Sequence, residues 1–196
     1  MSMFGQVSVK NNQYKIKGDF HHMTQNMPIR DIDDGLKLLG VTNPRDMTYI
    51  HSYGGEAIFF ESLCKGKLMA TRCDNPKCET KGSIYQPFRI YCPDCLSKNT
   101  VIDMTDIAKK SAKVHTFMVC ERSGAFSLLD KPIKFINVEF EGVVTILMSY
   151  LAVGEPSFGM KVVPCFKRQD PTFTILDLCF VPEGTKADQL PRGFSF

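Results

Sequence analysis

The hydrophobic and polar positions near the start of the chain predict a hairpin followed by helices. In residues 1–22, apolar side chains alternate with polar ones on either side of an Asn-Asn pair, as in two strands joined by a turn. Apolar residues on one helical face predict a helix over 29–39, and Asn43 followed by Pro44 is typical of the start of another. We therefore expect a hairpin and a helical arm over 1–55.

Helical spacing returns over 56–65, and a basic connector over 105–110 predicts a short helical turn. After residue 113 the pattern changes, because apolar and polar residues alternate in five runs bounded by turn residues. These predicted strands cover 114–120, 133–140, 143–151, 160–166 and 173–180. Glu141-Gly142 predicts a tight turn between the second and third strands. Five short strands favour a closed barrel of the OB-fold type.

Two close pairs of cysteines lie between the second helical segment and the strands. Cys73 and Cys78 form a C-x4-C pair, and after thirteen intervening residues Cys92 and Cys95 form a C-x2-C pair. This spacing is typical of the four ligands of one tetrahedral zinc ion, with each pair on a tight turn. Four thiolates fill every coordination position, so we expect a structural zinc ion, with iron in a four-sulfur site as the alternative.

The residues between the two cysteine pairs are rich in aromatic and β-branched side chains. The segment 84–91 predicts a strand that enters the second turn, and its rings, Tyr85, Phe88 and Tyr91, are expected to form the small core of a zinc ribbon. The predicted fold is therefore mainly β, with an N-terminal helical arm and a zinc ribbon followed by a five-stranded OB-fold barrel.

This organisation divides the chain into four expected parts. The expected parts are a hairpin and helical arm (1–55), a helix with the zinc ribbon (56–104), an OB-fold barrel (105–184) and a C-terminal tail (185–196). The tail contains charges, proline and glycine, which is typical of an extended segment that docks through Phe194 and Phe196, or of a disordered end.

Composition narrows the class of protein. The chain has 196 residues, of which 43% are hydrophobic, and its net charge of +3 is too small to require a nucleic-acid partner. No apolar run is long enough for a membrane helix, and the first ten residues lack the features of a signal peptide. We therefore expect a cytoplasmic protein without a membrane partner, in which cysteines bind metal or pack as thiols instead of forming disulfides.

Catalytic residues are not apparent in the sequence. The histidines His21, His22, His51 and His115 belong to no recognisable Cys/His, Ser/His/Asp or HExxH arrangement. The cysteines outside the two pairs are expected to be packed thiols and not nucleophiles; they are Cys64, Cys120, Cys165 and Cys179. The sequence thus predicts no catalytic residue in this chain.

Several separated motifs occur in an order that resembles one known family. The segment Phe59–Leu68 leads into Thr71-Arg72-Cys73, and Gln86–Cys95 contains the second cysteine pair. Lys113–Phe117 and Phe158–Val162 follow. Over about residues 56–184, this arrangement resembles the acyl-CoA-associated zinc-ribbon/OB-fold family, in which a helix, a rubredoxin-like zinc ribbon and an OB barrel succeed one another.

The resemblance implies a non-catalytic subunit that helps to bind acyl-CoA. Members of that family partner thiolases, hydratases or aldolases in hetero-oligomers, and the long N-terminal arm resembles the small subunits of anaerobic aromatic-degradation thiolases such as benzoylsuccinyl-CoA thiolase. This chain departs from the common pattern at the first turn, where C-x4-C replaces C-x2-C. Basic residues that could meet the phosphates of CoA, without a firm assignment, are Arg72, Arg89, Lys113, Lys161, Lys167 and Arg168.

A second class of function is a binding module for single-stranded nucleic acid. Zinc ribbons and OB barrels can both bind single strands with aromatic side chains in a basic groove. Here no run of lysine and arginine exceeds two residues. We therefore favour the acyl-CoA subunit, without a nucleic-acid partner, and keep the nucleic-acid module as the alternative.

Overall fold

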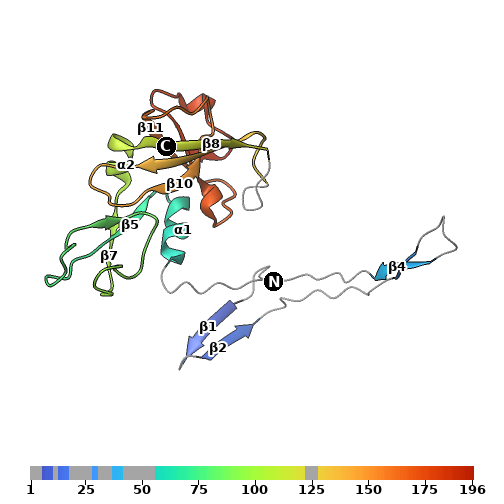
Figure 1. Ribbon diagram of the computed structural model, residues 1–196, viewed down its shortest axis with the longest axis horizontal. Coiled ribbons are helices and arrows are strands. Elements are labelled where there is room, and N and C mark those ends of the chain that lie inside the picture. Colours follow the sequence, from blue (N-terminus) through green and yellow to red (C-terminus); the bar gives the residue numbers. More distant parts are fainter. Residues whose placement is uncertain (1–5, 11–12, 18–27, 31–36, 42–55, 122–127) are drawn as a thin grey trace. The chain divides into compact units, whose positions relative to one another are not determined.

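The computed structural model describes residues 6–10, 13–17, 28–30, 37–41, 56–121 and 128–196 (Figure 1). Internal contacts divide the chain into two units, 1–51 and 52–196. In the first unit, β1 (Gln6–Lys10) pairs antiparallel with β2 (Gln13–Lys17). This pairing confirms the predicted N-terminal hairpin. The boundaries expected at 55, 104 and 184 stay predictions.

The helix predicted over 29–39 is wrong where the structure describes this segment. β3 (Pro28–Arg30) and β4 (Leu38–Val41) are strands that pair antiparallel, with Ile29 opposite Gly40. Short apolar runs fit a buried strand as well as a helix, so their spacing did not decide between the two. The second helix, predicted from Pro44, lies outside the described residues.

The second unit begins with α1 (Ala57–Cys64), which confirms the helix predicted over 56–65. Its buried side chains include Phe59 and Leu63, which are four residues apart and therefore share one face of the helix. That face packs against the largest hydrophobic cluster of the unit. Gly66, with a φ of +73°, follows the helix and allows the chain to turn back into the next strand.

A three-stranded antiparallel sheet carries the cysteine pairs (Figure 1). Its central strand is β5 (Met69–Arg72), flanked by β6 (Ile84–Tyr85) and β7 (Thr100–Asp103). The strand predicted over 84–91 is therefore confirmed only at its first two residues. Pro87 has no N–H to donate to a neighbouring strand, and β6 ends two residues before it.

The segment after the ribbon forms a short helix and two more three-stranded sheets. The helix α2 (Thr105–Ser111) confirms the predicted helical turn. One sheet has the order β10-β9-β8 and the other β12-β11-β13. The strands are β8 (Lys113–Cys120), β9 (Ile133–Glu139), β10 (Leu147–Tyr150), β11 (Val162–Lys167), β12 (Leu178–Pro182) and β13 (Phe194–Ser195).

The two sheets are separate ladders joined by isolated bridges. Lys113 of β8 bridges Lys161 just before β11, and Leu151 just after β10 bridges Phe180 of β12. The sheets therefore do not close into one continuous ladder. What the structure confirms is a mainly β unit with few helices and a cysteine cluster.

The third predicted strand, 143–151, begins later than expected. The tight turn predicted at Glu141-Gly142 is present, with Val143 N–H donating to the Phe140 carbonyl at 3.3 Å. It is not a hairpin turn, because β10 starts only at Leu147. Instead, the segment before β10 turns toward the ribbon: Val143 bridges Ile84, and Val144 N–H donates to the Ile84 carbonyl at 3.0 Å. Alternation alone could not show that these residues pair with the ribbon.

The last predicted strand also begins later, because a buried carboxylate organises the residues before it. A 3-10 turn, η1 (Ile175–Asp177), precedes β12. The Asp177 carboxylate accepts hydrogen bonds from the backbone N–H groups of Thr172 and Phe173, at 2.8 and 2.6 Å. This local network draws the segment into a turn.

The C-terminal tail docks on the second sheet. β13 pairs with β11, with Phe194 opposite Lys167, and Phe194 packs against a buried cluster. The predicted docking of the tail is therefore confirmed at Phe194, whereas Phe196 is 38% exposed and a 3-10 turn, η2 (Ala187–Gln189), interrupts the segment before it. Among the described residues, no helix has the length and apolar character to cross a membrane.

Candidate metal centre

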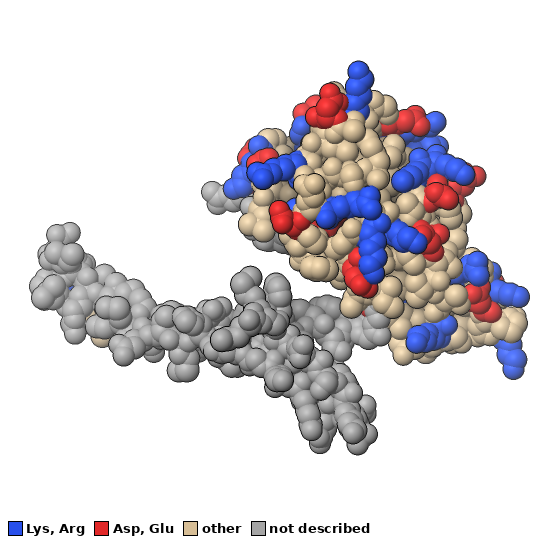
Figure 2. All heavy atoms as spheres, turned by 180° about the vertical axis from the view of Figure 1, so that it is seen from behind, with Lys and Arg blue, Asp and Glu red and all other residues tan. Residues whose placement is uncertain are grey.

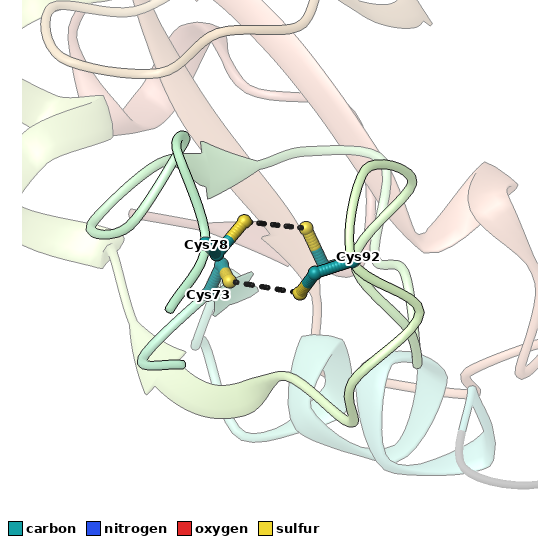
Figure 3. Close-up of side chains that lie close together, drawn as sticks. Cys73, Cys78 and Cys92 are labelled. Carbon is teal, nitrogen blue, oxygen red and sulfur yellow. Dashed lines mark hydrogen bonds between the residues drawn. The ribbon is translucent and has the colours of Figure 1, made fainter. Parts of the chain in front are cut away.

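The four paired cysteines meet at one point of the ribbon. Their sulfur atoms all lie within 4.8 Å of one another. The Sγ atoms of Cys73 and Cys95 are 3.7 Å apart, and those of Cys78 and Cys92 are 3.9 Å apart. Figure 3 shows the side chains of Cys73, Cys78 and Cys92 directed toward one another. The structure thus brings together all four predicted residues.

The first cysteine turn is built by the backbone after β5. Cys73 N–H donates to the Ser83 carbonyl at 3.1 Å, and the Cys73 carbonyl accepts from Gly82 N–H at 2.7 Å. Inside the turn, the Asn75 side chain accepts from Lys77 N–H at 3.0 Å. An asparagine that bonds two residues ahead stabilises a turn, and here it brings Cys78 back beside Cys73.

The second cysteine turn closes over a shorter loop. Cys92 N–H donates to the Ser97 carbonyl at 2.9 Å, and Leu96 N–H donates to the Cys92 carbonyl at 3.0 Å. Leu96 has a φ of +56°, a conformation that costs a residue with a Cβ about 1–2 kcal/mol. The turn therefore holds Cys92 and Cys95 together at the expense of local backbone strain.

Side chains outside the cysteines join the two turns to each other. The Asn75 amide donates to the Ser97 hydroxyl at 3.0 Å, and the Thr80 hydroxyl donates to the Asp94 carboxylate at 2.6 Å. The Tyr85 hydroxyl lies 3.5 Å from the Cys92 sulfur. These residues orient the ligands, a role that polar neighbours commonly have around metal sites.

The environment of the thiols favours a bound cation. Burial and contact with the other thiols raise the pKa of Cys73 to about 12. Burial also opposes ionisation of Cys92, but the Cys95 backbone N–H and the Tyr85 hydroxyl outweigh it and lower the pKa of that thiol to about 6. Four adjacent thiolates repel one another without a cation, so a divalent ion at their centre would stabilise the fully ionised set.

The sulfur spacing fits one tetrahedral ion. With zinc–sulfur bonds of about 2.3 Å, the edge of a tetrahedron of sulfurs is about 3.8 Å. The separations of 3.7 and 3.9 Å lie on either side of this value. Cys73, Cys78 and Cys92 are buried, so such an ion would be shielded from solvent on that side. The residues present therefore fit a closed, four-sulfur metal site.

The expected aromatic core of the ribbon is only partly correct. Tyr85 is buried with the cysteines of the ribbon, whereas Phe88 is buried in the largest cluster of the unit, with its ring centroid 6.3 Å from that of Phe59. Tyr91 is 58% exposed. Tyr91 stands in an isolated antiparallel bridge with Lys98, just before Cys92. Alternation along a strand did not predict its exposure, because β6 has already ended at this point.

The remaining candidate residues do not converge on the metal centre. Arg72 is paired with Asp74 at 2.7 Å, and His115 Nδ1 lies 2.7 Å from the Glu139 carboxylate on the surface. Arg89, Lys113, Lys161 and Arg168 are exposed, and Lys167 is half-buried. His21, His22 and His51 lie outside the described residues.

The four other cysteines lie in or against the packed parts of the unit. Cys165 and Cys179 are fully buried and stand opposite each other on β11 and β12. Cys64 and Cys120 are half-buried. Burial raises the pKa of Cys179 well above its usual value and also raises that of Cys64.

Sequence reasoning missed the polar residues that support the site. Asn75 lies inside the first cysteine pair, Thr80 lies between the two pairs, and Asp94 lies inside the second pair. The one available signal was the asparagine before Pro76, a combination that favours turns. Thr145 was not predictable, because it is 59 residues from Gln86, to which it bonds twice.

Comparisons with known proteins show a likeness of fold. No family model matches this sequence, and no curated protein matches it. A crystal structure of a protein of unknown function of the DUF35 family from Sulfolobus solfataricus is 22% identical, with coverage of 68% of this chain and 90% of that one and a TM-score of 0.47. A structure described as Ltp2-ChsH2(DUF35) aldolase is 19% identical, with coverage of 68% and 98% and a TM-score of 0.51.

Proposed function

We propose that this chain is a non-catalytic, zinc-binding subunit of an acyl-CoA-processing complex. The observation that carries the proposal is the four-sulfur site, set in a fold similar to a structure described as Ltp2-ChsH2(DUF35) aldolase. In our proposal the chain docks on a thiolase-fold enzyme and helps to bind acyl-CoA. The motif order over about residues 56–184 supports the same assignment.

Zinc is the metal we propose for the four cysteines, with Cys73, Cys78, Cys92 and Cys95 as its ligands. Zinc would supply four metal–sulfur bonds that hold the two turns together, a structural contribution and not a chemical step. Because the four thiolates complete the tetrahedron, no position remains for water or substrate. Asn75 and Asp94 would keep the ligands in place through their bonds to Ser97 and Thr80.

We also propose that β8 to β12 form an OB-type barrel. The β8–β10 meander and the two bridges that join it to β11 and β12 support this arrangement. Two backbone hydrogen bonds of 2.9 Å connect the two sheets next to these bridges. Val114 N–H donates to the Met160 carbonyl, and Ala152 N–H donates to the Phe180 carbonyl. Slow hydrogen exchange at these two amides is expected of a barrel, and rapid exchange would contradict it.

Two of the thiols outside the metal site, Cys64 and Cys179, support a non-catalytic role. A thiolase nucleophile needs a cysteine of lowered pKa or an adjacent base. Burial raises the pKa of Cys64 and Cys179, which is the opposite shift. The Cys64 thiol donates to the Phe60 carbonyl of its own helix, with a sulfur–oxygen distance of 3.7 Å, and no general base pairs with it in that hydrogen bond. We therefore assign the chemistry of the complex to the partner.

The partner we propose is a thiolase such as benzoylsuccinyl-CoA thiolase of anaerobic aromatic degradation, in a cytoplasmic hetero-oligomer. The long N-terminal arm and the family motifs support that choice. Eight cysteines without a disulfide are consistent with a reducing compartment. On the face that Figure 2 shows, lysine and arginine are interspersed with acidic residues, so the charge on this face does not favour the nucleic-acid alternative.

Affinity purification of the full chain from its native cell tests this proposal. We expect a thiolase-fold enzyme to be retained, and we expect acyl-CoA turnover by that enzyme to fall when this chain is removed. Turnover of acyl-CoA by the purified chain alone would contradict the non-catalytic role. A retained enzyme that is fully active without the chain would contradict the auxiliary role.

A further inference from the structure

A second cluster of charged side chains lies around an open cavity of about 620 Å³. We call this space the lysine cavity, because it is lined by Lys110 near the end of α2, Lys113 at the start of β8 and Lys161 just before β11. Lys113 and Lys161 stand opposite each other in an antiparallel bridge. Like charges in directly opposite positions destabilise a sheet, so the bridge itself does not explain this pair of lysines.

The acidic residues near the lysine cavity do not neutralise it. Glu139 stands opposite Lys113 on the neighbouring strand, but its carboxylate lies 2.7 Å from His115 Nδ1. Lys161 has a long contact of 3.9 Å with Glu183. The ion pairs of the described residues leave out three charged residues that line the cavity, Lys110, Lys113 and Glu141. The excess of positive charge favours a bound anion, and phosphate is a common partner of lysine.

One wall of the lysine cavity is apolar and leads to a second cavity. Val144 and Ile146 line the lysine cavity and are exposed. Met148, two residues further on, is also exposed and lines a cavity of about 260 Å³. Leu147 between them is buried, so Ile146 and Met148 lie on the same side of the chain. The two cavities therefore follow one another along the start of β10.

The second cavity, which we call the apolar cavity, is lined mainly by hydrocarbon side chains. Phe60 of α1, Pro87 of the ribbon and Ile175 of η1 border it together with Met148. Glu56 is the one charged residue of its lining. A hydrophobic cavity with few polar groups is typical of a site for an apolar ligand group. A ligand that fits both cavities would have an anionic group at one end and an apolar chain at the other.

We propose that acyl-CoA binds across these two cavities, with its phosphates in the lysine cavity and its acyl chain in the apolar cavity. The pantetheine arm then lies over Val144 and Ile146, which stand between the lysines and Met148. The inference rests on the proposed function for the choice of acyl-CoA among anions with an apolar chain. Charge would orient the ligand, and burial of its acyl chain would add affinity.

Calorimetric titration of the full chain with hexanoyl-CoA, CoA and inorganic phosphate tests this site. We expect hexanoyl-CoA to bind most tightly, because it alone reaches both cavities. The double variant Lys113→Gln/Lys161→Gln should raise the Kd for CoA and for hexanoyl-CoA about tenfold or more, because it removes two charges that face the phosphates. Met148→Gln should raise the Kd for hexanoyl-CoA about threefold or more and leave that for CoA unchanged.

Lys109→Gln and Met118→Gln are the matched controls. Lys109 is the exposed neighbour of Lys110 on α2, and Met118 is an exposed methionine of β8; neither lines the lysine cavity or the apolar cavity. We expect each control to keep every Kd within about twofold of the unmodified value. Thermal unfolding of all these variants should match the unmodified chain, because the replaced side chains are exposed.

The outcomes distinguish this inference from the proposed function. Failure of the full chain to bind hexanoyl-CoA, or an unchanged Kd in the lysine double variant, would overturn the site, whereas docking on a thiolase-fold enzyme is tested separately by affinity purification. CoA or inorganic phosphate bound as tightly as hexanoyl-CoA would also overturn it, because the apolar cavity would then contribute nothing. Lysine-dependent binding of hexanoyl-CoA by a chain that retains no acyl-CoA enzyme would support the site and overturn the docking role.

Discussion

The ribbon and the sheets that follow it are stabilised in different ways, although both belong to residues 52–196. The ribbon's own buried cluster consists of three cysteines and Tyr85, with Cys95 at its edge. The sheets bury a much larger set of apolar side chains, among them Phe166, Phe180 and Leu178. Burial of apolar surface can stabilise the sheets, whereas the ribbon needs its bound ion. Predictions that separate these two sources of stability follow, from the largest effect to the smallest.

The largest effect is expected from Cys92→Ser, which removes a fully buried ligand. Structural zinc contributes about 10–16 kcal/mol to the folding of zinc-finger peptides, so we expect the variant to lose the metal, the ribbon structure and binding of the partner. The signals of the sheet residues should persist in a two-dimensional NMR spectrum. A soluble variant that retains zinc and binds its partner would show that the ligand assignment is wrong.

The sheets should respond to a core substitution that leaves the metal in place. Phe180 is fully buried on β12 and contacts the Phe140 ring, with ring centroids 6.3 Å apart. Phe180→Ala should lower the free energy of unfolding by about 3–5 kcal/mol. Urea denaturation measures this loss, and metal analysis should still find one ion per chain. Loss of the ion from the folded variant would mean that the two regions are not independent.

Thr145→Val should weaken the connection between the two regions. The Thr145 hydroxyl accepts from Gln86 N–H and donates to the Gln86 carbonyl, both at 2.8 Å. Valine has a similar shape but leaves both backbone groups without this partner, at a cost of about 1–3 kcal/mol. Calorimetry should show ribbon and sheet unfolding at temperatures further apart than in the unmodified chain. A single unfolding transition at the temperature of the unmodified chain would show that Thr145 does not connect the ribbon to the sheets.

The smallest effect is expected from Asn75→Ala. This change removes the bond to Ser97 and the turn bond to Lys77 N–H, both 3.0 Å long, while all four ligands remain. We expect a loss of about 1 kcal/mol in stability and faster transfer of zinc to a chelator. Glu79→Ala, at the exposed residue directly after Cys78, is the control and should change neither quantity. Equal rates of zinc release in the Asn75 and Glu79 variants would show that Asn75 does not stabilise the metal site.

The sequence predicted the structure best where neighbouring residues determine it. The cysteine spacing brings Cys73, Cys78, Cys92 and Cys95 together, because the two local turns that hold them can be recognised from short motifs. The strands at 114–120 and 160–166 were predicted from alternation and are present as β8 and β11, with small differences in their bounds.

The predictions were less successful where distant residues decide the local structure. Val143 and Thr145 were assigned to a strand but pair with the ribbon at Ile84 and Gln86. The start of the last strand became a turn, because a buried Asp177 captures backbone N–H groups. The helix over 29–39 was wrong where it can be compared, because a short apolar run satisfies the strand β3 as well. Single-sequence patterns contain no information about these partners.

The metal content and the coordination geometry of the ion test most directly the claim that the four cysteines bind one structural zinc ion. The full chain, purified without added metal, should contain one zinc ion, and X-ray absorption should show four sulfur neighbours at about 2.3 Å. Iron in that position would contradict the assignment of zinc. A folded chain free of metal, with the four thiols open to alkylation, would contradict the account as a whole.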